Sequence, residues 1–461
     1  MMYTVPFKIP LNTEEFESAL QKGQGRTLLH VREMGLGEYE HSIIAACLCN
    51  QAYDAQCEGY RTDWLLEIVD ATGEAKRISQ KLLQTLHANT DNFWDACQRC
   101  QIALRLAQRG YEEARAFLYS CLRKWPDTAD VIGAEEIIKL DGADGLIKVA
   151  EYLGTLLQTE DSFWIDEGML NLFDEAQGAG AGRKVLETAA VNSPQVSFYL
   201  QYLDERSKQK SGSSDIQPGS GYLRLDSVQF AADAHSSHVR KMQDITVASV
   251  INEIETEDPE SNQYWFSSWG RHASVDDLAT VFESMILQSD PGRLSKYFRI
   301  FMHQPLPTFD ARMLSFAWHA NPEVRKSAHK ALSNYSHTSV RKLVVDKLEA
   351  GLFIEGELKL LARNYEHGDA AKLERILHVS DDRDLLHGVL FDLVKVFQSN
   401  KVAESTNLML FVYDQSPCSN CRRNAVELLL STGTAPDWLL VECQYDSSEE
   451  IRLMVKSIEK N

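Results

Sequence analysis

The second half of the chain repeats a short helical pattern that cannot form a stable fold as a single copy. The clearest copy is Asn321–Leu332, where an Asn-Pro start precedes apolar residues such as Val324 and Ala328 on one helix face. Related starts recur at Ser416–Leu430 and Ser447–Ile458. An isolated amphipathic helix leaves its apolar stripe in water, whereas stacked helix pairs bury that stripe against their neighbours. The sequence therefore predicts an all-α fold, an alpha-solenoid of stacked antiparallel helix pairs.

The pattern also predicts where the second helix of each pair begins. From about Val275 onward the unit recurs roughly every 30 residues, which is a period typical of helix-pair repeats. The predicted second helices begin near Gly292, Pro322, Ile354, Asp382, Pro417 and Ser447. In the first half, Asn92–Trp94 and Ser162–Trp164 each precede a predicted helix pair. We therefore expect helix pairs there too, but less regular ones.

The C-terminal copies resemble HEAT-type repeats between about residues 275 and 461. The resemblance depends on an apolar residue followed by arginine in the first turn of the second helix. This slot holds Val324-Arg325, Cys421-Arg422 and Ile451-Arg452, and it is missing at Asp382–Phe397. The resemblance implies a right-handed superhelix whose second helices line the concave side, and it implies no reaction. On repeat position alone, the candidate contacts to a partner are Arg325, His329, Arg422 and Arg452.

A segment rich in Gly, Ser, Pro and Lys separates the two halves. It runs from about Arg206 to Tyr222 and has little apolar content, which is typical of a surface loop or a hinge. Both readings stay open. We expect an irregular helical-repeat domain at 1–205, a linker or loop at 206–222, and a HEAT-like domain at 223–461.

The charge balance limits the class of partner. The chain has 67 acidic and 47 basic residues among 461, a net charge of −20, so nucleic acid is not the expected partner. No stretch approaches the roughly 20 apolar residues that span a bilayer, and the N-terminus does not read as a secretory signal. The nine cysteines mostly sit in apolar helical contexts, which favours reduced thiols and a cytoplasmic protein. The sequence does not indicate an oligomeric state.

Two Cys-x-x-Cys pairs are candidates for thiol chemistry. Cys418 and Cys421 lie at a predicted helix start, where the helix dipole and a neighbouring arginine favour a reactive dithiol. The alternative is that Cys418 is a turn residue and Cys421 fills the apolar repeat position. Cys97 and Cys100 lie within a predicted helix far away in sequence, so a shared zinc site is not expected. We predict no metal and no cofactor, because the chain also lacks metal-binding His-Glu motifs and a phosphate-binding loop.

A polar cluster near the N-terminus is the candidate small-molecule or peptide pocket. It is formed by His41, Tyr53, Asp54, Glu58 and Arg61, in a segment that is otherwise apolar and helical. The alternative is a helix cap at Asp54 with a surface ion pair between Glu58 and Arg61.

A group of large aromatic side chains is the last candidate feature. Tyr264, Trp265, Phe266 and Trp269 lie within six residues and form either buried core or an anchor for a partner.

Together these features predict a non-enzymatic cytoplasmic scaffold or adaptor that binds a protein or peptide on the concave face of a helical solenoid. The alternative is an enzyme or a ligand or redox sensor. Its site would be the pocket at His41–Arg61 or a thiol switch at Cys418 and Cys421.

Overall fold

The computed structural model describes residues 8–126, 128–160, 163–212, 245–256, 264–350, 356–377 and 379–458. Helices dominate the described residues. Within them, the strands β1 (Arg123–Lys124) and β2 (Val131–Ile132) form one short antiparallel pair. The predicted all-α class is therefore confirmed. Of the expected linker at 206–222, residues up to 212 continue helix α12 (Pro194–Gly212), and the rest lies outside the described residues.

The described residues form two compact units. The terminal unit contains the described parts of Phe7–Ser220 together with Val441–Asn461, and the central unit contains those of Gly221–Leu440. The expected domain of 223–461 is divided, because the described residues from 441 to 458 group with the first half. In a strictly linear solenoid each repeat contacts only its neighbours in sequence, so the return of this segment departs from that scheme.

The terminal unit is built from helices that mostly pack on close neighbours in sequence. Helix α2 packs on α5, α5 on α7, α7 on α9 and α9 on α12. Its helices are α1 (Thr13–Lys22), α2 (Gly25–Met34), α3 (Glu40–Leu48), α4 (Ala55–Glu58), α5 (Thr62–Ala71), α6 (Ala75–Thr85), α7 (Phe93–Gln108), α8 (Glu112–Cys121), α9 (Ala134–Thr159), α10 (Gly168–Gln177), α11 (Ala181–Ala190), α12, and the C-terminal α26 (Glu449–Ile458).

The C-terminal segment contacts the N-terminal helices through both backbone and side chains. The Trp64 indole donates a hydrogen bond to the Tyr445 carbonyl at 2.9 Å, and Arg452 forms an ion pair with Glu67 at 2.9 Å. The backbone of Gly25 lies so close to that of Glu442 that a Cβ on residue 25 would be 2.0 Å from the Glu442 carbonyl oxygen. Only glycine fits such a backbone approach. The contacts therefore fix residues 441–458 against the start of the chain.

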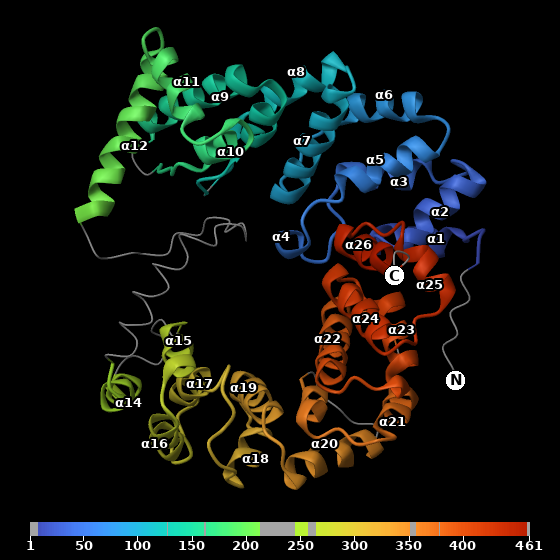
Figure 1. The fold of residues 1–461 in the computed structure, drawn as a ribbon, viewed down its shortest axis with the longest axis vertical. Coiled ribbons are helices and arrows are strands. Elements are labelled where there is room, and N and C mark those ends of the chain that lie inside the picture. Colours follow the sequence, from blue (N-terminus) through green and yellow to red (C-terminus); the bar gives the residue numbers. More distant parts are fainter. Residues whose placement is uncertain are drawn as a thin grey trace. The chain divides into compact units, whose positions relative to one another are not determined.

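The described residues of the central unit form six consecutive pairs of elements. In each pair but the last, the second element packs on the second element of the next pair. The second elements follow one another in the order α15, α17, α19, η1, α22 and α24. Figure 1 labels α15, α17, α19, α22 and α24. The pairs are α14 (Val247–Thr256) with α15 (Tyr264–His272), α16 (Val275–Met285) with α17 (Pro291–Ile300), α18 (Arg312–Phe316) with α19 (Pro322–Ser333), α20 (Thr338–Ala350) with η1 (Leu358–Arg363), α21 (Asp369–Ile376) with α22 (Arg383–Ser399), and α23 (Thr406–Gln415, preceded by η2, Ala403–Ser405) with α24 (Ser419–Ser431). Helix α25 (Asp437–Cys443) crosses the boundary between the two units.

Local capping explains why the second helices begin near the predicted residues. The Asn321 side chain accepts hydrogen bonds from the backbone of Glu323 and Val324, and Pro322 occupies the first turn, where no donor is lost. Asp382 caps α22 in the same way, although the apolar-arginine pattern is missing there. The start expected near Ile354 lies outside the described residues, and the next described element is the six-residue 3-10 helix η1.

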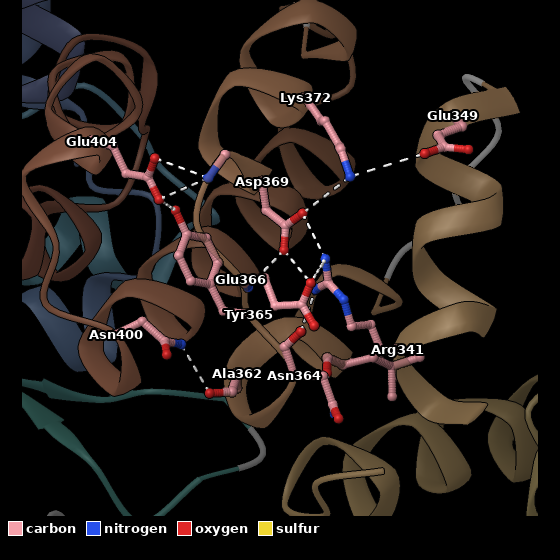
Figure 2. A network of polar contacts seen from close by, with 12 residues as sticks. Arg341, Glu349, Ala362, Asn364, Tyr365, Glu366, Asp369, Lys372, Asn400 and Glu404 are labelled. Carbon is pink, nitrogen blue, oxygen red and sulfur yellow. Dashed lines mark hydrogen bonds and ion pairs between the residues drawn. The ribbon is translucent and has the colours of Figure 1, made fainter. Parts of the chain in front are cut away.

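A polar network holds the short η1 in place (Figure 2). Asn364, at the end of η1, accepts a hydrogen bond from the His337 backbone at 2.9 Å and donates to the Tyr335 and Leu360 carbonyls, both at 2.9 Å. Arg341 of α20 donates to the Asn364 carbonyl at 2.6 Å and pairs with the buried Asp369 at 2.7 Å. These bonds add to the apolar packing of η1, whose Leu358, Leu360 and Leu361 are buried.

Asp369 anchors this network as a charged group. Its burial favours the neutral acid, but hydrogen bonds from Arg341 and from the Glu366 backbone outweigh that effect, so the pKa of Asp369 is lowered. On the far side, Glu404 accepts hydrogen bonds from the Tyr365 hydroxyl and from the Gly368 backbone. The network therefore joins α20, η1, α21 and η2 by part-buried polar contacts.

Candidate functional site

Two of the predicted contact arginines have the same internal role in the repeat. The Arg325 guanidinium donates to the carbonyl of His319 at 2.7 Å, six residues earlier, and Arg452 donates to the carbonyl of Asp446, also six residues earlier. In both cases the arginine ties its helix to the turn that precedes it. At these two positions the slot arginine therefore has a structural role inside the repeat.

The other two predicted contacts are buried. His329 is 1% exposed, and its Nε2 lies 3.1 Å from the Ala317 carbonyl. Burial lowers the pKa of His329 to about 4, so the ring is neutral near pH 7. Arg422 is fully buried as well. Repeat position alone placed these side chains at a surface contact, but the structure packs both inside the protein.

Three other basic side chains, each on the second element of a pair, lie near one another in the central unit. We define the cationic strip as Arg299 of α17, Lys330 of α19 and Lys359 of η1, three elements that pack in that order. Partial burial lowers the pKa of Lys330, and the positive charges of Lys359, Arg299 and Lys326 lower it further. Like charges from successive elements are therefore close enough to disfavour one another. Lys359 also has an acidic neighbour, the buried Asp392, at 3.7 Å.

Further cations lie beyond the strip, of which Lys347 pairs with Glu357. Burial lowers the pKa of His303, and the charges of Arg271 on α15 and of Lys330 add to that effect. On the other side, the Lys347 ammonium lies 3.7 Å from the ring centre of Trp318, which is 54% exposed. Lys347 and Lys359 both act on the pKa of His329, which places Trp318 beside the same group of cations. An exposed tryptophan next to a charged surface is a common anchor for a protein partner.

The polar cluster near the N-terminus forms a cap and an ion pair. The Asp54 side chain accepts the Cys57 backbone hydrogen at 3.0 Å, and the Glu58 side chain accepts that of Asp54 at 2.9 Å, a reciprocal cap of α4. Arg61 pairs with Glu58 at 3.1 Å and donates to the Gln21 carbonyl at 2.6 Å. His41 lies exposed on α3, and Tyr53 is half-buried before α4. These contacts favour the structural reading of the cluster.

A cavity lies elsewhere in the terminal unit, at residues that the sequence did not single out. Its volume is about 460 Å³, and it lies between the 86–91 loop, α7, α8 and the two strands. Charged or polar lining groups include His87, Asp91, Arg99 and Arg123, together with the thiol of Cys121. No local motif marks these residues, because they come from four separate elements.

The Cys121 thiol has an unusual environment in this cavity. A hydrogen bond from Cys100 lowers the pKa of Cys121, and the charges of Arg123 and Arg99 add to that effect against the opposing effect of burial. In contrast, burial raises the pKa of Cys97 to about 12. Cys100 therefore hydrogen-bonds to Cys121, although the Cys-x-x-Cys motif in the sequence pairs Cys100 with Cys97.

Cys418 and Cys421 lie at the start of α24, and both are buried. The structure brings a third residue to them, because a ring nitrogen of His387 and both sulfur atoms lie within 4.8 Å of one another. In the sequence, His387 is one of several single histidines with no motif.

The aromatic group of α15 is largely core. Phe266 and Trp269 are 0% and 2% exposed, and the Trp269 indole donates to the Ile245 carbonyl at 3.0 Å. The ring of Trp265 packs on that of Phe266, with 4.2 Å between the ring centroids. The side chain of Tyr264 lies outside the described part of the chain.

No protein-family model matches the chain, and comparisons with curated proteins and with solved structures gave no match. Among the described residues, no helix combines the length and the apolar character needed to cross a bilayer.

Proposed function

We propose that the protein is a non-enzymatic scaffold whose central unit binds an acidic protein or peptide segment on the cationic strip. The observation that carries this proposal is the convergence of Arg299, Lys330 and Lys359 from three successive elements in a chain of net charge −20. The net charge alone favours a basic or neutral partner, but the local arrangement favours an acidic one, because a bound carboxylate relieves the repulsion among the cations.

The repeat architecture that supports this function is HEAT-like. Its support is the series of six pairs and the shared bond from the slot arginine to the carbonyl six residues before it. The regular spacing of second helices would present one cation per repeat, which suits an extended peptide. The proposal keeps the expected cytoplasmic location, where neighbouring thiols such as Cys100 and Cys121 stay reduced.

Binding would use a preformed surface. Trp318 would supply apolar contact area at the edge of the strip, and the three cations would set the register through charge-assisted hydrogen bonds. Because an anion beside Lys330 raises its lowered pKa, binding would be coupled to proton uptake when the lysine is partly deprotonated.

The test uses the full chain and a fluorescently labelled peptide of alternating Glu and Gly residues. We expect saturable binding that weakens as salt is added. Lys330→Glu and Lys359→Glu should each weaken binding by roughly tenfold or more, since a hydrogen bond to a charged group contributes about 1.5–3 kcal/mol. Lys342→Glu is the matched control. Lys342 lies on α20, which is the first element of its pair, whereas the strip lies on second elements, and its side chain is 76% exposed.

Two results would overturn the proposal. One is an equal loss of affinity in the Lys342 control, which would mean a nonspecific charge effect. The other is tighter binding of a Lys-Gly peptide of the same length than of the Glu-Gly peptide.

A second function, a thiol-based sensor or enzyme, is favoured by the Cys121 cavity. A thiol with a lowered pKa, beside Arg99 and Arg123 in a cavity of about 460 Å³, suits a small anionic electrophile. The sequence placed this kind of chemistry at Cys418 and Cys421 or at the polar cluster. The cavity at Cys121 is the better-supported place for it.

A further inference from the structure

Three metal-ligating side chains converge at the end of the central unit. His387 lies on α22, Cys418 is the N-cap residue of α24, and Cys421 lies in the first turn of that helix. Their ligating atoms lie within 4.8 Å of one another. Around a tetrahedral Zn²⁺, with bonds of about 2.0–2.3 Å, ligand atoms are roughly 3.5–4 Å apart. The cluster is therefore close to the geometry of such a site.

The local structure does not need the Cys418 thiol for capping. Helix N-caps are usually Ser, Thr, Asp or Asn, whose oxygen accepts a backbone hydrogen, and Cys418 makes no such bond. Ser416 fixes the turn instead, since its hydroxyl accepts the Cys418 backbone hydrogen at 3.2 Å and donates to the Cys418 carbonyl at 3.2 Å. The turn thus places the Cys418 sulfur close to that of Cys421 and to a ring nitrogen of His387.

The electrostatics of the site suit a cation held by thiolates. The N-terminal end of α24 carries a partial positive charge, which stabilises a thiolate there. Both cysteines are buried, and two buried thiolates need a compensating charge. A divalent cation supplies that charge and releases the thiol protons to solvent when it binds.

We propose that His387, Cys418 and Cys421 bind a thiophilic divalent cation of the Zn²⁺ type. Two sulfur ligands and one imidazole nitrogen match the preference of Zn²⁺ over hard cations such as Mg²⁺ and Ca²⁺. The three ligands named here leave one position of a tetrahedral ion for water or for an incoming ligand. The bound ion would tie α22 to α24, independently of any partner on the cationic strip.

Cobalt(II) is the probe, because it occupies zinc sites and gives sulfur-to-metal and tetrahedral absorption bands. The full chain is purified, treated with a chelator under reducing conditions, and titrated with Co²⁺. We expect one ion per chain with thiolate charge-transfer absorption. Cys418→Ser/Cys421→Ser should lose that absorption, while Cys49→Ser/Cys57→Ser, at two exposed thiols of the terminal unit, should keep it.

His387→Gln tests the third ligand in a chain that retains both thiols. It should weaken Co²⁺ binding by at least the roughly 10–100-fold that loss of an outer-shell partner costs, and shift the absorption bands. A thermal melt of the wild-type chain with and without Zn²⁺ gives a readout that needs no substitution, and Zn²⁺ should raise the melting temperature.

Three outcomes would overturn the metal site. One is a wild-type chain with reduced thiols that takes up no Co²⁺, and another is a Cys418/Cys421 double variant that binds Co²⁺ with an unchanged spectrum. An unchanged affinity and spectrum in His387→Gln would equally remove the third ligand. Loss of peptide binding by Lys330→Glu bears only on the scaffold proposal, so the two sets of results are separable.

Discussion

The carboxylate of Glu442 accepts hydrogen bonds from Nε and Nη2 of Arg26 at 2.7 and 3.1 Å, although 416 positions separate the two residues. Glu442 is fully buried and Arg26 nearly so. The pair lies within the terminal unit, beside the close approach of Gly25 to the Glu442 backbone. It shows that the first and last helical segments of the chain fold as one unit.

Removing Arg26 should destabilise the terminal unit strongly. Arg26→Ala takes away the bidentate partner of a buried carboxylate, and breaking a buried pair costs about 3–5 kcal/mol. We expect a lower midpoint in urea unfolding and faster hydrogen exchange in α1, α2 and residues 441–458. Arg105→Ala is the matched control, because its bidentate pair with Asp63 is exposed and should contribute less than about 1 kcal/mol. Equal losses in both variants would contradict the burial argument.

His329 should make the central unit sensitive to acid. Its folded pKa of about 4 lies below the unfolded value of about 6.5, so the unfolded chain binds more protons between those pH values. The contribution of His329 to stability is full above about pH 6.5 and falls as the pH drops toward 4, by up to roughly 3 kcal/mol.

The measurement is urea unfolding of the wild-type and His329→Gln chains at pH 7, 6 and 5. The variant should lose less stability between pH 7 and pH 5 than the wild type does. His41→Gln, at an exposed histidine of the other unit, should keep the wild-type slope. A slope unchanged by His329→Gln would mean that the buried ring does not titrate as described.

Glu136 should give stability the opposite pH dependence from that of His329, because its contribution is lost as the pH rises. Burial raises its pKa to about 7, above the unfolded value of about 4.3, so the folded chain binds more protons between these values. Its favourable contribution is full below about pH 4.3 and is lost as the pH rises through 7. Glu136→Gln, which keeps a polar group near Gln101, should therefore stabilise the terminal unit at pH 8 by about 1–3 kcal/mol. A destabilised variant at pH 8, in calorimetry or urea unfolding, would show that the carboxylate is needed there.

Cys121 should react faster than a more exposed cysteine. Its pKa is lowered by Cys100 and the nearby arginines, whereas burial and Asp95 raise the pKa of Cys49 despite its exposure. Iodoacetamide at pH 7 followed by mass spectrometry should label Cys121 before Cys49, and Cys97 last. Cys100→Ser tests the cause, because a hydroxyl donor should keep much of the reactivity and Cys100→Ala should not. Labelling in order of exposure alone would contradict this account.

The sequence determined most of the local structure. The Asn-Pro start at Asn321 predicts the cap that the structure shows, and the apolar-arginine slot predicts a second helix at α19, α24 and α26. These signals are readable because capping and helix periodicity depend on residues three or four positions apart. The start of α22 followed from Asp382 even where the repeat pattern was missing.

Only the tertiary structure decided which distant residues meet. Arg26 and Glu442, Cys100 and Cys121, and His387 with Cys418 and Cys421 carry no mark in sequence spacing, because each contact depends on how whole helices pack. The tertiary structure also decided which of the predicted contact residues are buried. His329 and Arg422 occupy positions that the repeat pattern assigns to a surface, yet both are enclosed, while Lys330 and Lys359 are brought close enough to repel each other. A linear chain specifies its helices through near neighbours, but charge and solvent access depend on all the segments that fold around a residue.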